Sequence, residues 1–393
     1  MNLTSELINR YHDKVIEYRR RMHAHPELSG CEQQTAAFIA QKLREMGLSP
    51  TENVGGFGIT ALIEGADSGK CIALRADFDA LPITECTGLP FSSEVPGVSH
   101  SCGHDVHTAM LLGAAHLLCD LRERFSGTVK LIFQPSEENA MESGAKKMIA
   151  EGVLEHPHVD AIIGQHVSPL CPSGKITLRK GAISSASDRF FITIRGKNSH
   201  ASKPETGIDA IAVGSQVLCA LQTVVSRSVS PLDNVVLTVG TVQAGTRYNV
   251  LAETFEAEGT CRNRDLRTRD LVRTRMESII RGVTEGMGAQ YMFRYIPGYL
   301  PTVNAPEMVD LLTDTAADLI GSEKIIPMEH ASMGGEDFCF YSERIPAVFW
   351  HLGCRKEGSE FWPIHNGHFS PDETVMDLGM QLLAETALRF LSE

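Results

Sequence analysis

Helical and strand-like hydrophobic patterns alternate over the first third of the chain. Apolar residues recur at helical spacing over 10–28 and 31–47, whereas short apolar runs bounded by Gly and Asp, over 57–65 and 71–77, are typical of strands. Further helices are predicted at 104–125 and 142–154, and further strands at 127–134 and 159–166. Strands that alternate with helices at this spacing indicate a largely parallel α/β sheet.

The middle third has a different order of elements. Strands are predicted at 187–196, 234–245, 252–262 and 289–296, with long helices at 207–227 and 267–288. This βαββαβ order is the ferredoxin-like split βαβ sandwich, which forms a compact domain of its own. After Pro297 the α/β pattern resumes with a helix, a strand and a final helix at 377–392.

The two patterns predict a split architecture. We expect an α/β catalytic domain over 1–183 and 298–393, with a mixed, mostly parallel sheet flanked by helices. The inserted βαββαβ domain is predicted over 184–297.

Composition narrows the class of protein. Hydrophobic residues make up 42% of the 393 residues and charged residues 22%, as in ordinary globular chains. A formal net charge of −13 argues against nucleic acid or an anionic membrane as a partner. No window approaches the roughly 18 uninterrupted apolar residues of a membrane span, and the charged start does not resemble a signal peptide. Ten scattered cysteines without a CxxC pair are typical of reduced thiols, so we expect a cytoplasmic protein.

The densest cluster of metal-ligand side chains is the segment SHSCGHDVHT, just before a predicted helix. Its Cys102 and His104 are ligand types suited to Zn, Co, Ni or Mn. The alternative is a polar helix cap, with Ser101 or Asp105 capping and His107 facing solvent or the core.

Other candidate side chains follow predicted strands. Each taken alone is explained equally well as a charged loop, a core residue or a turn. Because the carboxyl ends of parallel strands meet at one edge of a sheet, their joint occurrence indicates a metal site there. These residues are Asp77 and Asp79, Glu137 and Glu138, His166, and His365 with His368.

The number of donors favours two ions. A four-coordinate catalytic metal needs three protein ligands, whereas five donors with one shared fit two metals about 3.5–4 Å apart with a bridging water. Glu137 then remains as general base for that water. The five donors are Cys102, His104, Glu138, His166 and His365.

The inserted domain offers weaker candidates. His200 lies in a polar loop after a strand, and from this segment alone an ordinary surface loop is the better explanation. Arg247, Asn249 and Arg262 could reach a substrate carboxylate, but so could many surface arginines. Gly335 offers a backbone amide near a cleft, although GG also suits a tight turn. No GxGxxG, Walker or GxSxG motif occurs.

Seven motifs occur along the chain in a fixed order. They are RADFDALP, HSCGHDVHTAMLLGAA, QPSEEN, GQHV, SHASKPE, GGEDF and HNGHFSPDE. With them the chain resembles the amidohydrolase branch of the aminoacylase and carboxypeptidase dinuclear metallohydrolases, which includes hippurate hydrolase, indole-acetyl-amino-acid hydrolases and N-acetyl-diaminopimelate deacetylase. The resemblance runs from about Met22 to the C-terminus. Three motifs, PSEEN, GGEDF and GKNSHAS, differ from the commoner family forms and argue against transferring substrate identity.

The resemblance implies that the five donors bind two divalent ions (Zn, Mn, Co or Ni) and that Glu137 is the general base. It implies that Asp79 orients a ligand and that His200 stabilises the oxyanion, in the same or the partner subunit's site. It also implies that the inserted domain acts as a lid and mediates a homodimer. His368 is left out because the first histidine of HNGHF matches the ligand position.

We therefore predict a dinuclear metal-dependent amidohydrolase that cleaves the amide bond of small N-acyl-amino acids, as aminoacylase or hippurate hydrolase does, with metal-bound hydroxide as nucleophile. A metallo-carboxypeptidase or dipeptidase is the nearest alternative. Weaker alternatives are an amidase with Cys102 as nucleophile and His104 as its base, and a non-catalytic metal-binding protein.

Overall fold

The computed structural model describes residues 3–393 and divides into two compact units. Unit 1 comprises Met1–Ile183, Thr302–His330 and Asp337–Glu393, and unit 2 comprises Ser184–Pro301 and Ala331–Glu336. The short second piece of unit 2 lies outside the predicted insert. It joins unit 2 through the Ser185 backbone N–H, which donates to the Gly334 carbonyl at 3.0 Å, a long-range contact that leaves no local pattern.

A mixed sheet of eight strands forms the centre of unit 1 within the described residues, in the order β1-β2-β4-β3-β5-β14-β6-β13. The adjacent strands β4, β3, β5 and β14 are parallel, while β1, β2 and β6 run antiparallel to a neighbour. The prediction of a mixed, mostly parallel sheet is thus confirmed. The strands are β1 (Thr51–Val54), β2 (Gly58–Glu64), β3 (Asp67–Asp77), β4 (Ser126–Gln134), β5 (Ala161–Pro172), β6 (Ile176–Leu178), β13 (Ile325–Pro327) and β14 (Ala347–Arg355).

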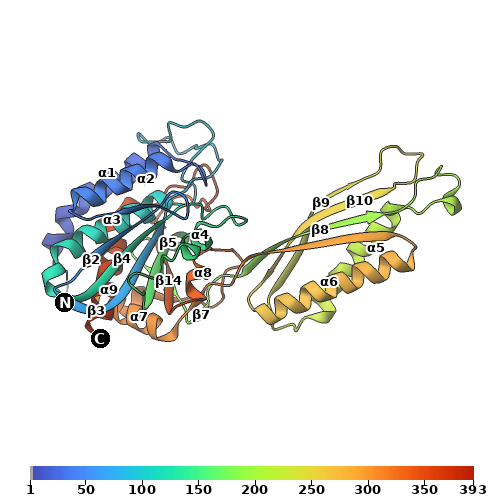
Figure 1. The fold of residues 1–393 in the computed structure, drawn as a ribbon. Helices are drawn as coiled ribbons and strands as arrows, with labels where there is room; N and C mark the ends of the chain where they lie inside the picture. Colours follow the sequence, from blue (N-terminus) through green and yellow to red (C-terminus); the bar gives the residue numbers. More distant parts are fainter. Residues whose placement is uncertain (1–2) are drawn as a thin grey trace. The chain divides into compact units, whose positions relative to one another are not determined.

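Helices flank this sheet, as Figure 1 shows. The central helix α3 (His104–Asp120) packs against α9 (Met376–Ser392) and β3, and α1 (Ser5–Ala24) lies over α3. Because α3 is buried on all sides, its sequence is almost continuously apolar after the first turn. The remaining elements are α2 (Gln33–Glu45), α4 (Gly144–Ala150), α7 (Pro306–Ile320), α8 (Cys339–Ser342) and the small sheet of β7 (Gly181–Ala182) with β12 (Val303–Asn304).

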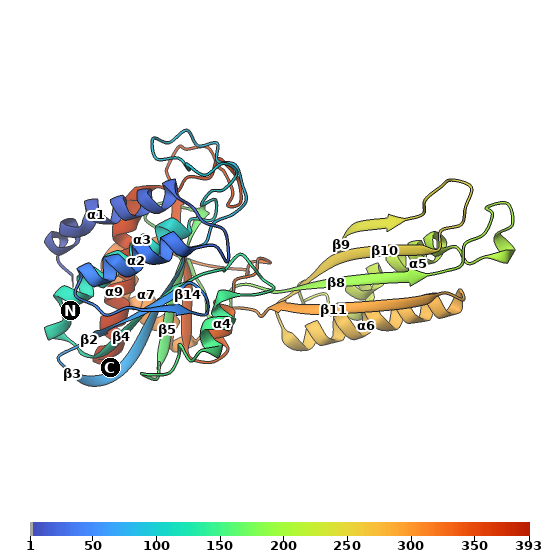
Figure 2. The same cartoon turned by 45° about the horizontal axis from the view of Figure 1, so that its top comes forward.

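Unit 2 has the predicted βαββαβ order. Its four strands pair antiparallel throughout in the order β11-β8-β10-β9. The two helices pack against each other and cover one face of the sheet (Figure 2). The elements are β8 (Ala186–Arg195), α5 (Ala210–Thr223), β9 (Val235–Ala244), β10 (Thr254–Asn263), α6 (Leu266–Gly286) and β11 (Gln290–Tyr299).

One helical stretch among the described residues, Ala210–Ser228, is long and apolar enough to cross a membrane by length and composition alone. It consists of α5 and a π-helical turn, Val224–Ser228. Val213, Val217 and Leu221 on one side of this stretch are buried in the core of unit 2.

Candidate metal centre

Three neighbouring strands and one helix position the predicted ligands of unit 1. Cys102 and His104 lie at the start of α3, Glu138 lies in the loop after β4, and His166 lies in β5. His365 lies in the loop after β14. Since β4, β3 and β5 are adjacent and parallel, the segments at their carboxyl ends meet at one edge of the sheet. His166 differs from expectation in one respect: β5 does not end there but continues to Pro172.

The first ligand group consists of Cys102, His104 and His166, whose ligand atoms all lie within 4.8 Å of one another. Cys102 Sγ is 3.3 Å from His166 Nε2. Gly103, between the first two ligands, has a φ of +91°, and a β-carbon there would lie 2.5 Å from Val167. Glycine therefore permits both the left-handed turn and the close packing at this point.

The ring orientation of both histidines suits metal binding. His104 Nδ1 donates to the Asp79 carbonyl at 2.8 Å, and His166 Nδ1 donates to the Val167 carbonyl at 2.6 Å. In its neutral form each ring therefore carries its lone pair on Nε2. His104 Nε2 is buried and has no hydrogen-bond partner among the described residues, as expected for an atom that binds an ion.

The second ligand group consists of Cys102, Glu138 and His365, again within 4.8 Å of one another. His365 Nε2 is 3.0 Å from Glu138 Oε1. Because Cys102 belongs to both groups, the donor set fits two neighbouring divalent ions with one shared ligand.

Asp79 connects two of these ligands. Its Oδ1 is 3.2 Å from His104 Nδ1, and its Oδ2 accepts from the backbone N–H of Glu138 at 2.9 Å. Burial alone would raise the pKa of Asp79, but hydrogen bonds from His104, the Ser29 hydroxyl and the Glu138 backbone lower it below its usual value. With these hydrogen bonds, Asp79 is suited to orient both an imidazole and the loop that carries Glu138.

Glu137 lies beside His104 and Glu138, and the ligand atoms of all three residues lie within 4.8 Å of one another. Its Oε2 lies 4.0 Å from His104 Nε2, and its Oε1 accepts from the backbone N–H of Asp337 at 3.4 Å. The side chain is buried, with 6% of the residue exposed. A carboxylate oriented by a backbone donor beside the ligand groups has the geometry of a general base.

The charges around the ligands favour a bound cation. Burial lowers the pKa of His104, but the carboxylates of Asp77 and Asp79 raise it to about 10. Burial, together with Glu138 and Glu137, raises the pKa of the Cys102 thiol well above its usual value. A nucleophilic cysteine needs a depressed pKa, so these surroundings disfavour the Cys102-nucleophile alternative, whereas a metal ion would stabilise the thiolate.

Comparison with known proteins identifies the family. The model of the Peptidase family M20/M25/M40 matches residues 73–389. The chain belongs to this family. The N-acetylcysteine deacetylase of Bacillus subtilis is 41% identical over 385 residues, covering 96% of this chain and 97% of that protein. Thermostable carboxypeptidase 1 of Saccharolobus solfataricus is 36% identical over 396 residues, covering 99% of both proteins.

A solved M20 structure matches nearly the whole chain. It is a dinuclear metal-binding peptidase from Bacillus subtilis, with a TM-score of 0.85, 37% identity and coverage of 98% of this chain and 99% of that one. The predicted resemblance to this group of metallohydrolases is therefore confirmed.

The other predicted site residues of this M20 chain belong to unit 2. His200 Nδ1 accepts from the Ser202 backbone N–H at 3.1 Å, which leaves its exposed Nε2 as the donor. Asn249 is adjacent to it, since its carbonyl accepts from Ala201 N–H at 3.1 Å. Arg262 lies on β10, and Gly335 packs so closely that a β-carbon would lie 2.4 Å from the Tyr299 ring.

Several buried polar residues near the centre were not singled out from the sequence. Arg75 in β3 donates to Asp77 and Asp337, both at 2.7 Å, and to Gln134 at 2.9 Å. A charged residue inside the apolar run CIALRAD is the pattern that could have revealed this network, because a buried arginine requires acidic partners. The sequence predicts Asp77 as a turn residue or a ligand and His107 as a residue that faces solvent or the core, and both are buried.

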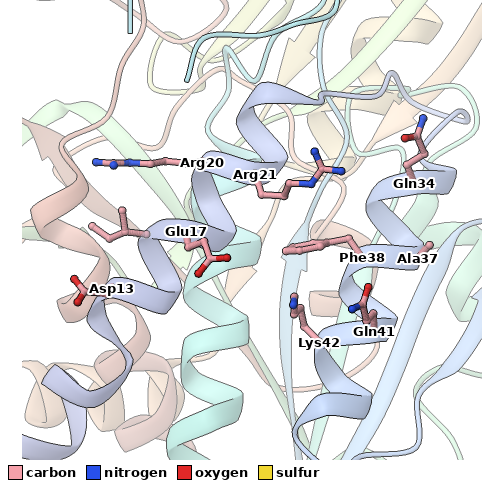
Figure 3. A pocket seen from close by; sticks show the side chains of 10 residues that line it. Asp13, Glu17, Arg20, Arg21, Gln34, Ala37, Phe38, Gln41 and Lys42 are labelled. Atoms are coloured by element: carbon pink, nitrogen blue, oxygen red, sulfur yellow. The ribbon is translucent and has the colours of Figure 1, made fainter. Parts of the chain in front are cut away.

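A groove of about 940 Å³ lies between α1 and α2, away from these residues (Figure 3). Its walls mix acidic side chains, such as Asp13 and Glu17, with basic ones, such as Arg21 and Lys42. None of the predicted site residues lines it.

Proposed function

We propose that this M20 protein is a metal-dependent amidohydrolase that cleaves N-acyl-amino acids into a carboxylic acid and a free amino acid. The observation that carries the proposal is the buried Glu137, which lies beside both ligand groups and is oriented by the Asp337 N–H. A site that only stored metal would have no need of such a base. The deacetylase relative supports the choice of N-acyl-amino acids.

The proposed ligands are Cys102, His104, Glu138, His166 and His365. Two divalent ions bound there would supply acidified water and polarise the acyl carbonyl; Zn, Mn, Co and Ni all suit this donor set. Glu137 Oε2 would accept the water proton and deliver it to the departing nitrogen. Asp79 holds His104 and the Glu138 backbone in place during this exchange.

Unit 2 is proposed to contribute the oxyanion and substrate contacts. The Nε2–H of His200 is a neutral or charged donor of the kind that stabilises a developing oxyanion. Asn249, Arg262 and the backbone of Gly335 are proposed to bind the substrate, with the guanidinium pairing with its carboxylate.

The nearest alternative is a carboxypeptidase, which the Saccharolobus relative supports. A substrate panel separates the amidohydrolase from the carboxypeptidase. Metal-reconstituted protein is incubated with N-acetyl-amino acids, N-benzoyl-amino acids and dipeptides that have free amino groups. We expect hydrolysis of the acylated substrates, dependent on added metal. Preferential cleavage of the dipeptides would favour the alternative, and no turnover of any member with two ions bound would favour a binding protein.

We also propose that the protein is a homodimer formed through unit 2. Strand β9 is one of the two edge strands of its sheet, and Val236 and Val242 on this strand are 38% and 48% exposed. Exposed edge strands pair readily with a second copy. Light scattering after size-exclusion chromatography should give twice the chain mass, and Val242→Lys should shift it to the monomer.

A cytoplasmic location is proposed on the state of the cysteines. Among the described residues no disulfide involves any of the ten cysteines, and six of them are buried. Free thiols persist in a reducing compartment. Fractionation of cells that produce the protein at native levels would test this location.

A further inference from the structure

His107 resembles a metal ligand by every local criterion. It follows His104 by one helical turn in α3, is 1% exposed, and its ring centroid lies 4.5 Å from that of His166. Asp77, His104 and His107 have ligand atoms within 4.8 Å of one another. Residue types and distances alone would therefore predict that His107 is a ligand as well.

The hydrogen bonds of His107 contradict that interpretation. The backbone N–H of Val167 donates to His107 Nε2 at 2.9 Å. Since an N–H group can only donate, Nε2 must carry the lone pair, and that lone pair is occupied. The proton is then on Nδ1, which donates to Asp77 Oδ1 at 2.6 Å. His104 and His166, in contrast, use only Nδ1 in hydrogen bonds to the backbone and keep Nε2 for an ion.

Asp77 is fixed in turn. Its Oδ2 accepts from Arg75 at 2.7 Å, and its backbone carbonyl accepts from the Thr108 hydroxyl at 2.7 Å. Because Arg75 occupies Oδ2 of this fully buried carboxylate, Oδ1 is left to accept from His107 Nδ1. Asp77, His107 and the Val167 N–H thus form one chain of three groups from β3 through α3 to β5.

We propose that His107 is a positioning residue and not a ligand: the Asp77–His107 pair holds the peptide between His166 and Val167, and thereby aims His166 Nε2 at the metal beside Cys102. The Val167 carbonyl accepts from His166 Nδ1, so both sides of Val167 are used to orient the same imidazole. The inference rests on the metal site of the proposed function but not on its substrate.

The decisive experiment identifies ligand nitrogens directly. The full-length protein is labelled with 15N-histidine and reconstituted with 113Cd. Cadmium–nitrogen coupling is expected at Nε2 of His104 and His166, while His107 shows a protonated Nδ1 and no coupling. Coupling at His107 would overturn the inference. Failure of the wild-type protein to bind any cadmium would overturn the proposed metal site, and this inference with it.

Variants of His107 test whether its contact with the Val167 N–H positions His166 for metal binding. His107→Leu removes the acceptor for the Val167 N–H and should weaken metal binding about 10–100-fold in competition with a chromophoric chelator, as is usual for residues that orient ligands. His107→Gln can still accept this N–H through its side-chain oxygen and should lose less. His116→Gln is the matched control, because this buried histidine lies on the same helix and contacts Tyr18 instead.

Wild-type metal affinity in a folded His107→Leu protein would contradict the positioning role. If this variant does not fold, the cadmium measurement on the wild-type protein still decides between ligand and positioning residue. Because neither measurement uses turnover, a wrong substrate assignment would leave both results intact.

Discussion

Glu32 accepts two hydrogen bonds from Ser136, one from its backbone N–H at 2.8 Å and one from its hydroxyl at 3.0 Å. Glu32 is fully buried at the start of α2, and Ser136 directly precedes Glu137. Ser136 has a φ of +54°, a left-handed conformation that costs a non-glycine residue about 1–2 kcal/mol. The Glu32 carboxylate therefore stabilises the turn that carries the proposed base.

We predict that Glu32→Leu lowers kcat about 10–100-fold, because the turn is released and Glu137 loses its position. Glu32→Gln keeps an acceptor for the Ser136 N–H and should retain more activity than the leucine variant. The measurement is steady-state turnover of an N-acyl-amino acid at saturating metal.

A neighbouring carboxylate provides the control for this prediction. Glu27 makes the same kind of double hydrogen bond to the backbone and hydroxyl of Thr35, at 2.7 and 2.9 Å. Glu27→Gln should reduce thermal stability but leave kcat unchanged. An unchanged kcat in Glu32→Leu as well would show that the turn does not depend on Glu32.

The order of elements and the fold class could be predicted from local sequence. Hydrophobic periods are enough to show β4 followed by a pair of glutamates, and the Cys102–His104 segment followed by a buried helix. Strands β6 and β13 were missed because three residues are too short to show a period. The βαββαβ order of unit 2 was visible because its strands and helices are long.

The roles of the individual histidines could not be predicted in this way. His104 and His107 are both buried histidines of the same helix, and what separates their roles is the group that faces each Nε2 atom. That difference depends on Val167, 60 residues further along the chain. Asp337, which reaches Glu137 across 200 residues, likewise has no local pattern.

Glu137→Gln should reduce turnover by about 10²–10⁴-fold, the usual contribution of a general base, while two metal ions remain bound. The amide keeps the size of the side chain and can still accept from Asp337 N–H, but it cannot take up a proton. Steady-state kinetics and elemental analysis of the same preparation measure turnover and bound metal. Glu142→Gln is the control, since Glu142 lies in the same loop with a side chain that is 63% exposed and pairs with Lys147. Substantial turnover in Glu137→Gln would exclude the residue as the base.

Metal affinity should rise steeply with pH. In the metal-free protein the carboxylates near His104 raise its pKa to about 10, and burial raises the pKa of the Cys102 thiol well above its usual value. Both groups therefore carry protons at neutral pH, and both must release them to bind an ion. Calorimetric titration in buffers of different ionisation enthalpy should count about two protons released.

The Cys102→Asp variant separates the two sources of these protons. An aspartate is already ionised at neutral pH, so we expect about one proton fewer to be released. Chelation should abolish turnover in the wild-type protein, and any of the proposed divalent ions should restore some of it. Proton release unchanged by the substitution would show that the thiol is not a ligand.

A buried ion pair between His23 and Glu85 should give the protein a pH-dependent stability that is separate from metal binding. His23 Nε2 is 3.2 Å from Glu85 Oε1, and its Nδ1 is 2.8 Å from Asp105 Oδ2. Burial opposes charge on both groups, but the hydrogen bond from His23 lowers the pKa of Glu85 to about 2, and Asp105 with Glu85 raises the pKa of His23. At about 1.4 kcal/mol per pKa unit, Glu85 contributes up to about 3 kcal/mol.

The sign of each shift defines the pH window. The contribution of Glu85 is present above its unfolded pKa of about 4.3 and is lost as pH falls towards 2. That of His23 is present below its unfolded pKa of about 6.5 and is lost as pH rises through its higher folded value. The stability difference between wild type and Glu85→Gln should therefore be largest between about pH 4.5 and 6.5.

Thermal unfolding from pH 3 to 9 measures this difference. Glu94→Gln is the control, because the side chain of Glu94 is 71% exposed. A difference that stays constant across this range would show that the pair is not ionised in the folded protein.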